Sequence, residues 1–238
     1  MQTIHIEKKQ AQLIAHRGVS KLERENTAAA FVAAGNRSYF GIETDIYKTL
    51  DGKFIIHHDP SVLRLTGVDW QIGEHTLEQL RTLRLQDWDD RGRGDLVMPT
   101  LEEYLRICRK YEKTAVLEIK RSVLPEDVPA VVETVKEEGY LEHTVFISFS
   151  LENMICLRQL LPEQPLQLLT RELTPEALDA FSRYGLDWDV DYRNLKAEQV
   201  QQVHALGRKV NVWTVDDPDT ARELIEMGVD YITTNILE

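Results

Sequence analysis

The sequence predicts an α/β fold, a TIM (β/α)8 barrel formed by a single domain over residues 1–238, with a small insertion after the second strand. Short apolar runs alternate with amphipathic stretches along the chain, as expected for a parallel sheet covered by helices. The 238 residues also suit a sheet of this kind that closes on itself, since such barrels commonly fill about 200–250 residues. The apolar runs that predict the eight strands are 12–16, 40–47, 115–120, 145–149, 166–170, 186–190, 209–215 and 230–234.

Helices are expected between most of these strands. Apolar residues at helical spacing or a closing glycine mark 26–35, 129–139 and 151–161 as helical. Two later helices are predicted to begin where an N-cap residue precedes a proline, at Thr174-Pro175 and at Asp217-Pro218. The last predicted strand ends close to residue 238, so an eighth helix is expected to be missing or very short.

One stretch departs from this alternation. A turn signal at Asp51-Gly52 follows the second strand, and residues 54–58 then fit a short returning strand. The stretch of about 60–99 is irregular, with one brief helix near 76–83. A long connection of this kind in a compact domain usually serves function.

Composition excludes several classes of protein. With 28 Lys and Arg against 40 Asp and Glu, the net charge is −12, and the absence of a basic stripe argues against a nucleic-acid partner. We expect no integral membrane segment, because no apolar run approaches the roughly 20 residues that a membrane helix needs. Two isolated cysteines and a charged opening segment favour a cytoplasmic protein. We expect a monomer or small homo-oligomer.

Three carboxylates are predicted to meet at the end of the barrel that carries the active site. Glu43 and Asp45 alternate along the second strand and so share one side, while Glu118 lies near the end of the third. Carboxylates that converge in this way raise one another's pKa unless a cation lies between them. An all-oxygen set predicts a divalent cation as cofactor, Mg²⁺ or Ca²⁺ rather than zinc.

His16 and His58 are the predicted proton carriers, because an imidazole near neutral pH can accept a proton while a second one donates. His58 is preferred to the adjacent His57, since neighbouring strand residues face opposite sides. With a cation and the nearby Arg17 and Lys120, these groups suit the stabilisation of a phosphoryl oxyanion.

Several short motifs follow one another in a fixed order. The first four are His16-Arg17-Gly18, Glu25-Asn26-Thr27, Glu43-Thr44-Asp45 and His58-Asp59. Later ones are 117–120 (LEIK), 148–149 (SF), 212–215 (VWTV) and 228–235 (GVDYITTN). In this order the chain strongly resembles the glycerophosphodiester phosphodiesterase family, over essentially its whole length.

The resemblance implies a TIM barrel that uses a divalent metal ion to hydrolyse a small-molecule glycerophosphodiester to glycerol 3-phosphate and an alcohol. It implies His16 and His58 as the catalytic acid–base pair, and the three carboxylates Glu43, Asp45 and Glu118 as metal ligands. The residues it implies for binding the substrate and its phosphate are Arg17, Lys120, Asn26 and Trp213. The supporting residues are Glu25 and Asp59.

Two positions depart from the family pattern, Arg24 in place of a proline and Asn235 in place of a terminal acid. Neither belongs to the histidines or the carboxylates, so activity is expected to be retained. Two other interpretations stay open, a lysophospholipase D or phospholipase-type phosphodiesterase on lipid substrates, and an inactive barrel that acts as a binding or scaffold protein. Phe149 is expected in the barrel core, and the alternating acids at 187, 189 and 191 on a solvated rim.

Overall fold

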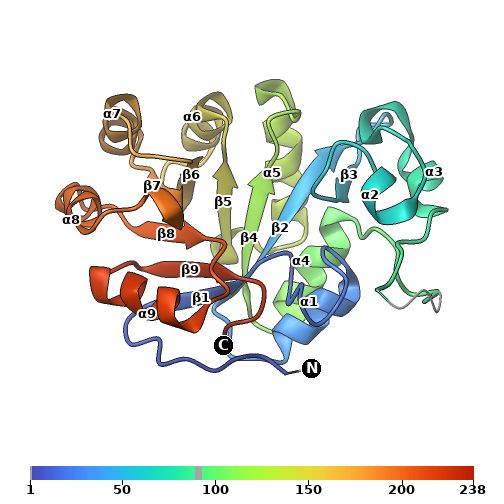
Figure 1. Ribbon diagram of the computed structural model, residues 1–238. Helices are drawn as coiled ribbons and strands as arrows, with labels where there is room; N and C mark the ends of the chain where they lie inside the picture. Colours follow the sequence, from blue (N-terminus) through green and yellow to red (C-terminus); the bar gives the residue numbers. More distant parts are fainter. Residues whose placement is uncertain (1, 89–92) are drawn as a thin grey trace.

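Eight parallel strands close into a ring in the computed structural model of the protein, which describes residues 2–88 and 93–238. The first and last strands pair with each other, and the first also pairs with the second, which closes the ring (Figure 1). The predicted TIM barrel is therefore confirmed. The strands of the ring are β1 (Gln12–Ala15), β2 (Gly41–Lys48), β4 (Thr114–Ile119), β5 (Thr144–Ser148), β6 (Leu166–Thr170), β7 (Asp187–Asp191), β8 (Val210–Trp213) and β9 (Tyr231–Thr234).

Alternation of side chains along these strands divides the core into two layers. Outward residues such as Leu117 and Val212 belong to the large cluster that packs against the helices. Inward residues such as Ile14, Val116 and Leu169 form a smaller cluster within the ring. Burial on both faces explains why the strands read as nearly continuous apolar runs in the sequence.

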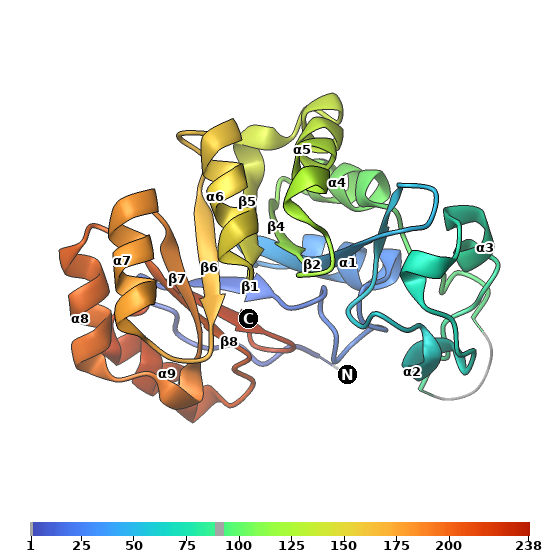
Figure 2. The same cartoon turned by 90° about the horizontal axis from the view of Figure 1, so that it is seen from above.

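Seven helices of the described residues follow strands of the ring, and they surround it on the outside (Figure 2). Their starts follow the sequence signals, because Thr27, Thr174 and Asp217 each accept a hydrogen bond from the first turn of a helix. Gly185 and Gly228 end two of them in the left-handed conformation. These helices are α1 (Ala28–Gly35), α4 (Leu101–Lys110), α5 (Val128–Glu137), α6 (Leu151–Leu160), α7 (Pro175–Tyr184), α8 (Ala197–Ala205) and α9 (Pro218–Met227).

In the part of the chain that the structure describes, single 3-10 turns lie in four of the connections. They are η1 (Ile72–Glu74), η2 (Pro125–Asp127), η3 (Leu141–His143) and η4 (Tyr192–Asn194).

The segment between β2 and α4 folds beside the barrel (Figure 1). It contains β3 (Phe54–Ile56), antiparallel to the end of β2, and the short helices α2 (Leu63–Thr66) and α3 (Leu77–Arg81). These elements share a hydrophobic cluster of their own, which includes Ile55 and Leu80. The expected insertion at about 60–99 falls within this segment, and its residues 89–92 lie outside the described ranges.

The chain that follows β9 forms no helix in the described part of the protein, as the sequence predicts. Instead, Ile4 pairs with Leu237, and the amide of Ile6 donates to the carbonyl of Glu238 at 2.7 Å. Ile236 and Leu237 are buried in the main core. No helix among the described residues is both long and apolar enough to cross a lipid bilayer.

Candidate active site

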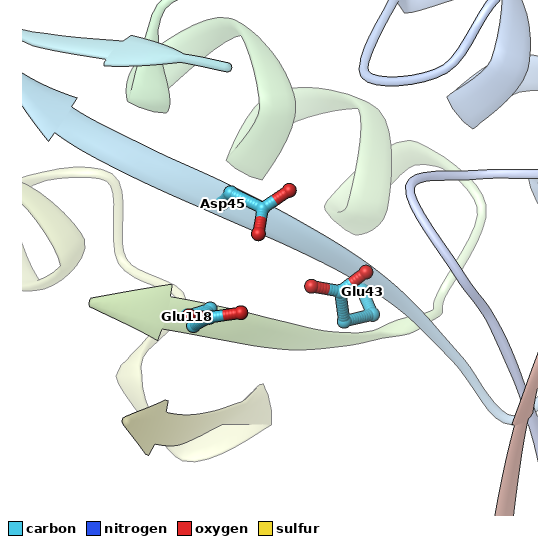
Figure 3. Close-up of side chains that lie close together, drawn as sticks. All are labelled: Glu43, Asp45 and Glu118. Carbon is cyan, nitrogen blue, oxygen red and sulfur yellow. The ribbon is translucent and has the colours of Figure 1, made fainter. Parts of the chain in front are cut away.

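Glu43, Asp45 and Glu118 form a buried acidic cluster inside one end of the barrel. Glu43 and Asp45 extend from β2, and Glu118 extends from the neighbouring β4, where it lies opposite Asp45 in the strand register (Figure 3). Each residue offers a carboxylate oxygen within 4.8 Å of the others. The predicted convergence of the three side chains therefore exists in the structure.

The electrostatics of this cluster fit a bound cation. Burial, with the neighbouring Asp45, raises the pKa of Glu43 well above its usual range. Burial also raises the pKa of Glu118, to about 7. A divalent cation would relieve this repulsion, and carboxylate oxygens are the donors that hard cations prefer. The acidic cluster is thus a site that can hold one divalent metal ion.

Lys120 forms ion pairs with two carboxylates of this cluster. Its Nζ lies 2.5 Å from Asp45 Oδ1 and 2.9 Å from Glu118 Oε1. Although burial opposes ionisation of Asp45, Lys120 and Arg17 hold the pKa of that carboxyl below its usual range. Lys120 also lines the cavity next to the cluster, so the same ammonium faces both the carboxylates and the open space.

His16 follows β1 and is held by a chain of side-chain hydrogen bonds. Its Nδ1 lies 2.7 Å from Asn235 Oδ1, and Asn235 Nδ2 donates to Asp216 Oδ2 at 2.8 Å. Because a carboxylate only accepts, the amide NH2 of Asn235 must face Asp216 and its oxygen must face His16. His16 therefore carries its proton on Nδ1, which leaves the Nε2 lone pair free.

The free Nε2 of His16 lies 3.9 Å from Glu43 Oε2. Burial, with the adjacent Arg17, lowers the pKa of His16 to about 4. The ring is therefore neutral near pH 7, with the lone pair on Nε2 available.

His58 lines the same cavity from the segment after β3. Its Nδ1 lies 2.7 Å from Asp59 Oδ1, and Arg64 Nε donates to the other oxygen of Asp59 at 2.5 Å. Burial lowers the pKa of His58. The neighbouring His57 is fully buried, and neither of its ring nitrogens has a hydrogen-bond partner among residues 2–88 and 93–238. The structure thus brings His58, and not His57, to the cavity.

Arg17 connects the first loop to the acidic cluster. Its backbone amide donates to Glu43 Oε2 at 2.9 Å, and its Nη1 donates to Glu25 at 2.8 Å. Glu25 in turn accepts two hydrogen bonds from Arg64 of α2. Arg17 has a left-handed backbone, and so does the following Gly18. The loop therefore turns sharply enough to aim both His16 and Arg17 at the cavity.

Asn26 is placed differently from the sequence expectation. It is 1% exposed, its Nδ2 donates to Asp45 Oδ2 at 2.7 Å, and its Oδ1 accepts from Thr44 at 2.8 Å. Both ends of the amide are thus bonded within the protein, and Asn26 is not among the residues that line the cavity. Its contact orients the Asp45 carboxylate from behind and does not extend toward a substrate.

The cavity at this site has a volume of about 130 Å³ and two kinds of wall. His16, Arg17, His58 and Lys120 line it with polar groups, together with the acids Glu43 and Glu118. Ile147, Leu169, Phe149 and Trp213 form its apolar side, and the two aromatic rings meet edge to face with centroids 5.8 Å apart. Phe149, expected only in the core, is therefore also part of the cavity wall.

Asp189 corrects another sequence expectation. It was expected on a solvated rim with Asp187 and Asp191, but it is 1% exposed and lines this cavity from β7. Burial, with the charge of Glu118, raises its pKa well above the usual range. Asp187 lies at the other end of the barrel, and Asp191 binds Arg193. A buried position for Asp189 follows from closure of the ring, which the alternating acids alone do not reveal.

A second and larger hollow, of about 600 Å³, lies at the opposite end of the barrel. The starts of the strands line it, with Thr114, Asp187, Lys209 and Tyr231 among its residues. Neither the acidic cluster nor His16 and His58 reach it. The cavity that contains the histidines and carboxylates is therefore the smaller of these two, at the carboxyl ends of the strands, where TIM barrels carry their active sites.

The fold and this site define a TIM-barrel enzyme built to act on an anionic substrate. Residues 16–238 match the model of the Glycerophosphoryl diester phosphodiesterase family. The chain belongs to this family, which confirms the resemblance and the enzyme class predicted from the sequence.

Individual relatives agree over nearly the whole chain. A glycerophosphodiester phosphodiesterase of Caldanaerobacter subterraneus is 28% identical, with 94% of this chain and 93% of that protein covered. The structure of an Oleispira antarctica phosphodiesterase in complex with the product sn-glycerol-3-phosphate superposes with a TM-score of 0.87, at 26% identity over 95% of this chain and 93% of that one. A glycerophosphodiester phosphodiesterase structure from Parabacteroides distasonis gives a TM-score of 0.83 at 29% identity, covering 96% and 94%.

Proposed function

We propose that this protein hydrolyses glycerophosphodiesters to glycerol 3-phosphate and an alcohol, by acid–base catalysis with His16 and His58. The observation that carries the proposal is the convergence of both histidines and two carboxylates of the acidic cluster, Glu43 and Glu118, on one cavity. The Oleispira relative, which holds sn-glycerol-3-phosphate as its product, supports the same substrate class.

The cofactor we propose is Mg²⁺ or Ca²⁺, held by Glu43, Asp45 and Glu118. When bound, such a cation supplies positive charge that stabilises phosphoryl oxygens. Arg17 and Lys120 line the cavity beside this cluster, and their cationic groups bind and orient the phosphate. The two residues offset the negative charge that would otherwise repel an anionic substrate from an acidic protein.

The two histidines differ in the hydrogen-bond partner of their Nδ1 atom. His16 is bonded through Nδ1 to the neutral amide of Asn235, and its Nε2 accepts a proton from the attacking nucleophile. His58 is bonded through Nδ1 to the carboxylate of Asp59, which opposes the lowering of the His58 pKa by burial, and its Nε2 donates a proton to the leaving alcohol. The nucleophile is water or a hydroxyl of the substrate itself.

We assign selectivity for the alcohol to the segment between β2 and α4, because Arg64 of α2 joins it to the site. Arg64 binds both Asp59, the partner of His58, and Glu25, the partner of Arg17. A change in this segment would therefore alter the positions of both His58 and Arg17 in the cavity.

The experiment that tests the proposal is a coupled assay of glycerol 3-phosphate release from a panel of glycerophosphodiesters. The assay is repeated with Mg²⁺, Ca²⁺ and EDTA, and lysophosphatidylcholine is included for the lipid alternative. His16→Ala and His58→Ala should each abolish turnover and leave the melting temperature nearly unchanged. His204→Ala is the matched control, since His204 pairs with Asp230 outside the cavity. Near-normal turnover by either of the first two variants would refute the assignment.

A further inference from the structure

The larger hollow, at the end of the barrel opposite the active site, is lined by charged side chains that do not pair with one another. Within residues 2–88 and 93–238, no ion pair joins any two of them. Their charges therefore surround an open space of about 600 Å³ without neutralising each other. The cations are Arg158, Arg208 and Lys209, and the acids are Glu142, Glu163 and Asp187.

Two guanidinium groups meet at one edge of this hollow. Arg208 Nη1 and Arg158 Nη2 both donate to the carbonyl oxygen of Gly185, at 3.0 and 3.1 Å. Arginine stays charged at any physiological pH, so two like charges share a single neutral acceptor. Burial, with the charge of Arg208, lowers the pKa of Arg158. An anion bound beside the pair would remove this repulsion.

Arg158 and Arg208 differ in how many donors they have left. Arg158 is fixed by the backbone, because its Nε donates to Tyr184 at 2.8 Å and its Nη1 to Pro162 at 2.6 Å. In the described part of the chain, Arg208 Nη2 makes no hydrogen bond. Lys209 Nζ donates to the hydroxyl of Tyr231 at 2.9 Å and has further N–H groups. Arg208 and Lys209 can thus donate to a ligand, while Arg158 adds a fixed positive charge.

The acids that line the hollow do not cancel these charges. Glu142 and Glu163 are exposed, so water and salt screen them, whereas both guanidiniums are half-buried. Burial raises the pKa of Asp187, and its Oδ1 accepts from the backbone amide of Lys209 at 2.9 Å. Glu142 and Glu163 would repel a long polyanion that filled the whole hollow. The arrangement therefore favours a compact anion held at the edge formed by the three cations.

We propose that Arg208, Lys209 and Arg158 form a binding site for a single phosphate group. A guanidinium matches the geometry of phosphate oxygens, and three cations suit a doubly charged phosphate better than a singly charged carboxylate. The site goes beyond the proposed function, since it lies at the opposite end of the barrel from the active-site cavity. Inorganic phosphate and a phosphate monoester such as sn-glycerol 3-phosphate share this chemistry, and the experiment separates these two sources.

The test follows binding by NMR at the site itself, because a phosphate can also enter the active site. The ¹⁵N-labelled protein is titrated with sodium phosphate and, separately, with sn-glycerol 3-phosphate. The amides of Gly185 and Gly207, which both line the hollow, report binding there. Sodium chloride at matched ionic strength gives the effect of salt alone. The variants are Arg208→Gln and Lys209→Gln, and the matched control is Arg222→Gln, since Arg222 pairs with Asp219 on α9 outside the hollow.

We expect saturable shifts of both glycine amides in the wild type and in Arg222→Gln. Arg208→Gln should weaken this binding by about 10-fold or more, the loss expected for a hydrogen bond between charged groups, and Lys209→Gln should weaken it in the same direction. Saturable binding of either ligand supports the site, and the ligand that binds identifies the source of the phosphate.

The proposal would be overturned if neither ligand shifted the two amides beyond the effect of sodium chloride. Wild-type affinity in Arg208→Gln would overturn it as well. Melting curves check the fold, and if Arg208→Gln does not fold, an unchanged affinity in Lys209→Gln has the same consequence. Absent turnover of every glycerophosphodiester is a separate result, which would contradict the proposed function alone.

Discussion

Replacing Asp216 by asparagine should reverse the hydrogen bonds that fix the proton on His16. Asp216 Oδ1 accepts from the backbone amide of Asn235 at 2.8 Å, and Oδ2 accepts from the Asn235 side chain at 2.8 Å. In Asp216→Asn the backbone amide cannot move, so the oxygen stays there and the new NH2 faces the Asn235 side chain. Asn235 then has to rotate its amide and present its own NH2 to His16 Nδ1.

The rotated amide forces the proton of His16 onto Nε2, where the lone pair is needed. General-base catalysis commonly contributes about 100- to 10,000-fold to a rate, and we expect kcat to fall by about 100-fold or more, roughly 3 kcal/mol of activation free energy. KM should change little, because Asp216 does not line the cavity. The ion pair of Asp216 with Lys21, 3.0 Å long and partly exposed, contributes at most about 1 kcal/mol to stability.

The double variant Asp216→Asn with Asn235→Asp provides the rescue. A carboxylate at 235 accepts from both the new amide and His16 Nδ1, so the original tautomer returns and kcat should recover. The assay is the release of glycerol 3-phosphate at saturating substrate, with melting curves for each variant. A wild-type kcat in Asp216→Asn, or a double variant no faster than the single one, would refute this account of the tautomer.

Three further outcomes are expected. Asp45→Asn should weaken Mg²⁺ or Ca²⁺ binding by more than about 100-fold in calorimetry, and EDTA should abolish turnover reversibly; unchanged binding would contradict the metal site. Burial lowers the pKa of His57 from 6.5 to about 4, so that as the pH drops the unfolded state binds a proton at His57 before the folded state does. The free energy of unfolding should therefore fall between about pH 6.5 and pH 4, by up to ~3 kcal/mol. His57→Phe should lose that part of the pH dependence in denaturant titrations, and superimposable profiles would count against it. Gly18→Ala should cost about 2 kcal/mol or more, because Gly18 has a φ of +77° and a Cβ there would lie 2.6 Å from the Ala30 backbone; an unchanged melting temperature would be evidence against this strain.

The strands and the acidic cluster were predictable because local patterns encode them. A strand buried on both faces leaves an apolar run of its own length, and the alternation of Glu43 and Asp45 fixes which side they share. The carboxyl ends of parallel strands lie at the same end of a barrel, so Glu118 was expected near these two residues. These properties need no knowledge of the partner strand, so the sequence alone was enough.

The contacts between distant segments were not predictable in the same way. Asn235 appeared in the sequence only as a departure from the family pattern, and nothing local connected it to Asp216 or His16. Asp189 resembled a solvated acid because a ring's interior cannot be told from its rim without the strand tilt and register. Asn26 lies behind Asp45 since its loop turns back toward β2, which depends on packing and not on a motif.

Pairing of β1 with β9 also links folding to catalytic competence. His16 and Asn235 are separated by 219 positions, and a contact this distant in sequence carries a large loop-closure cost unless the segments between the two residues have already folded. A chain that has folded every unit except β9 would have its carboxylates in place but no partner to set the His16 proton. Hydrolytic activity should therefore appear only with the final closure of the ring, and refolding followed by activity should lag behind refolding followed by helix content.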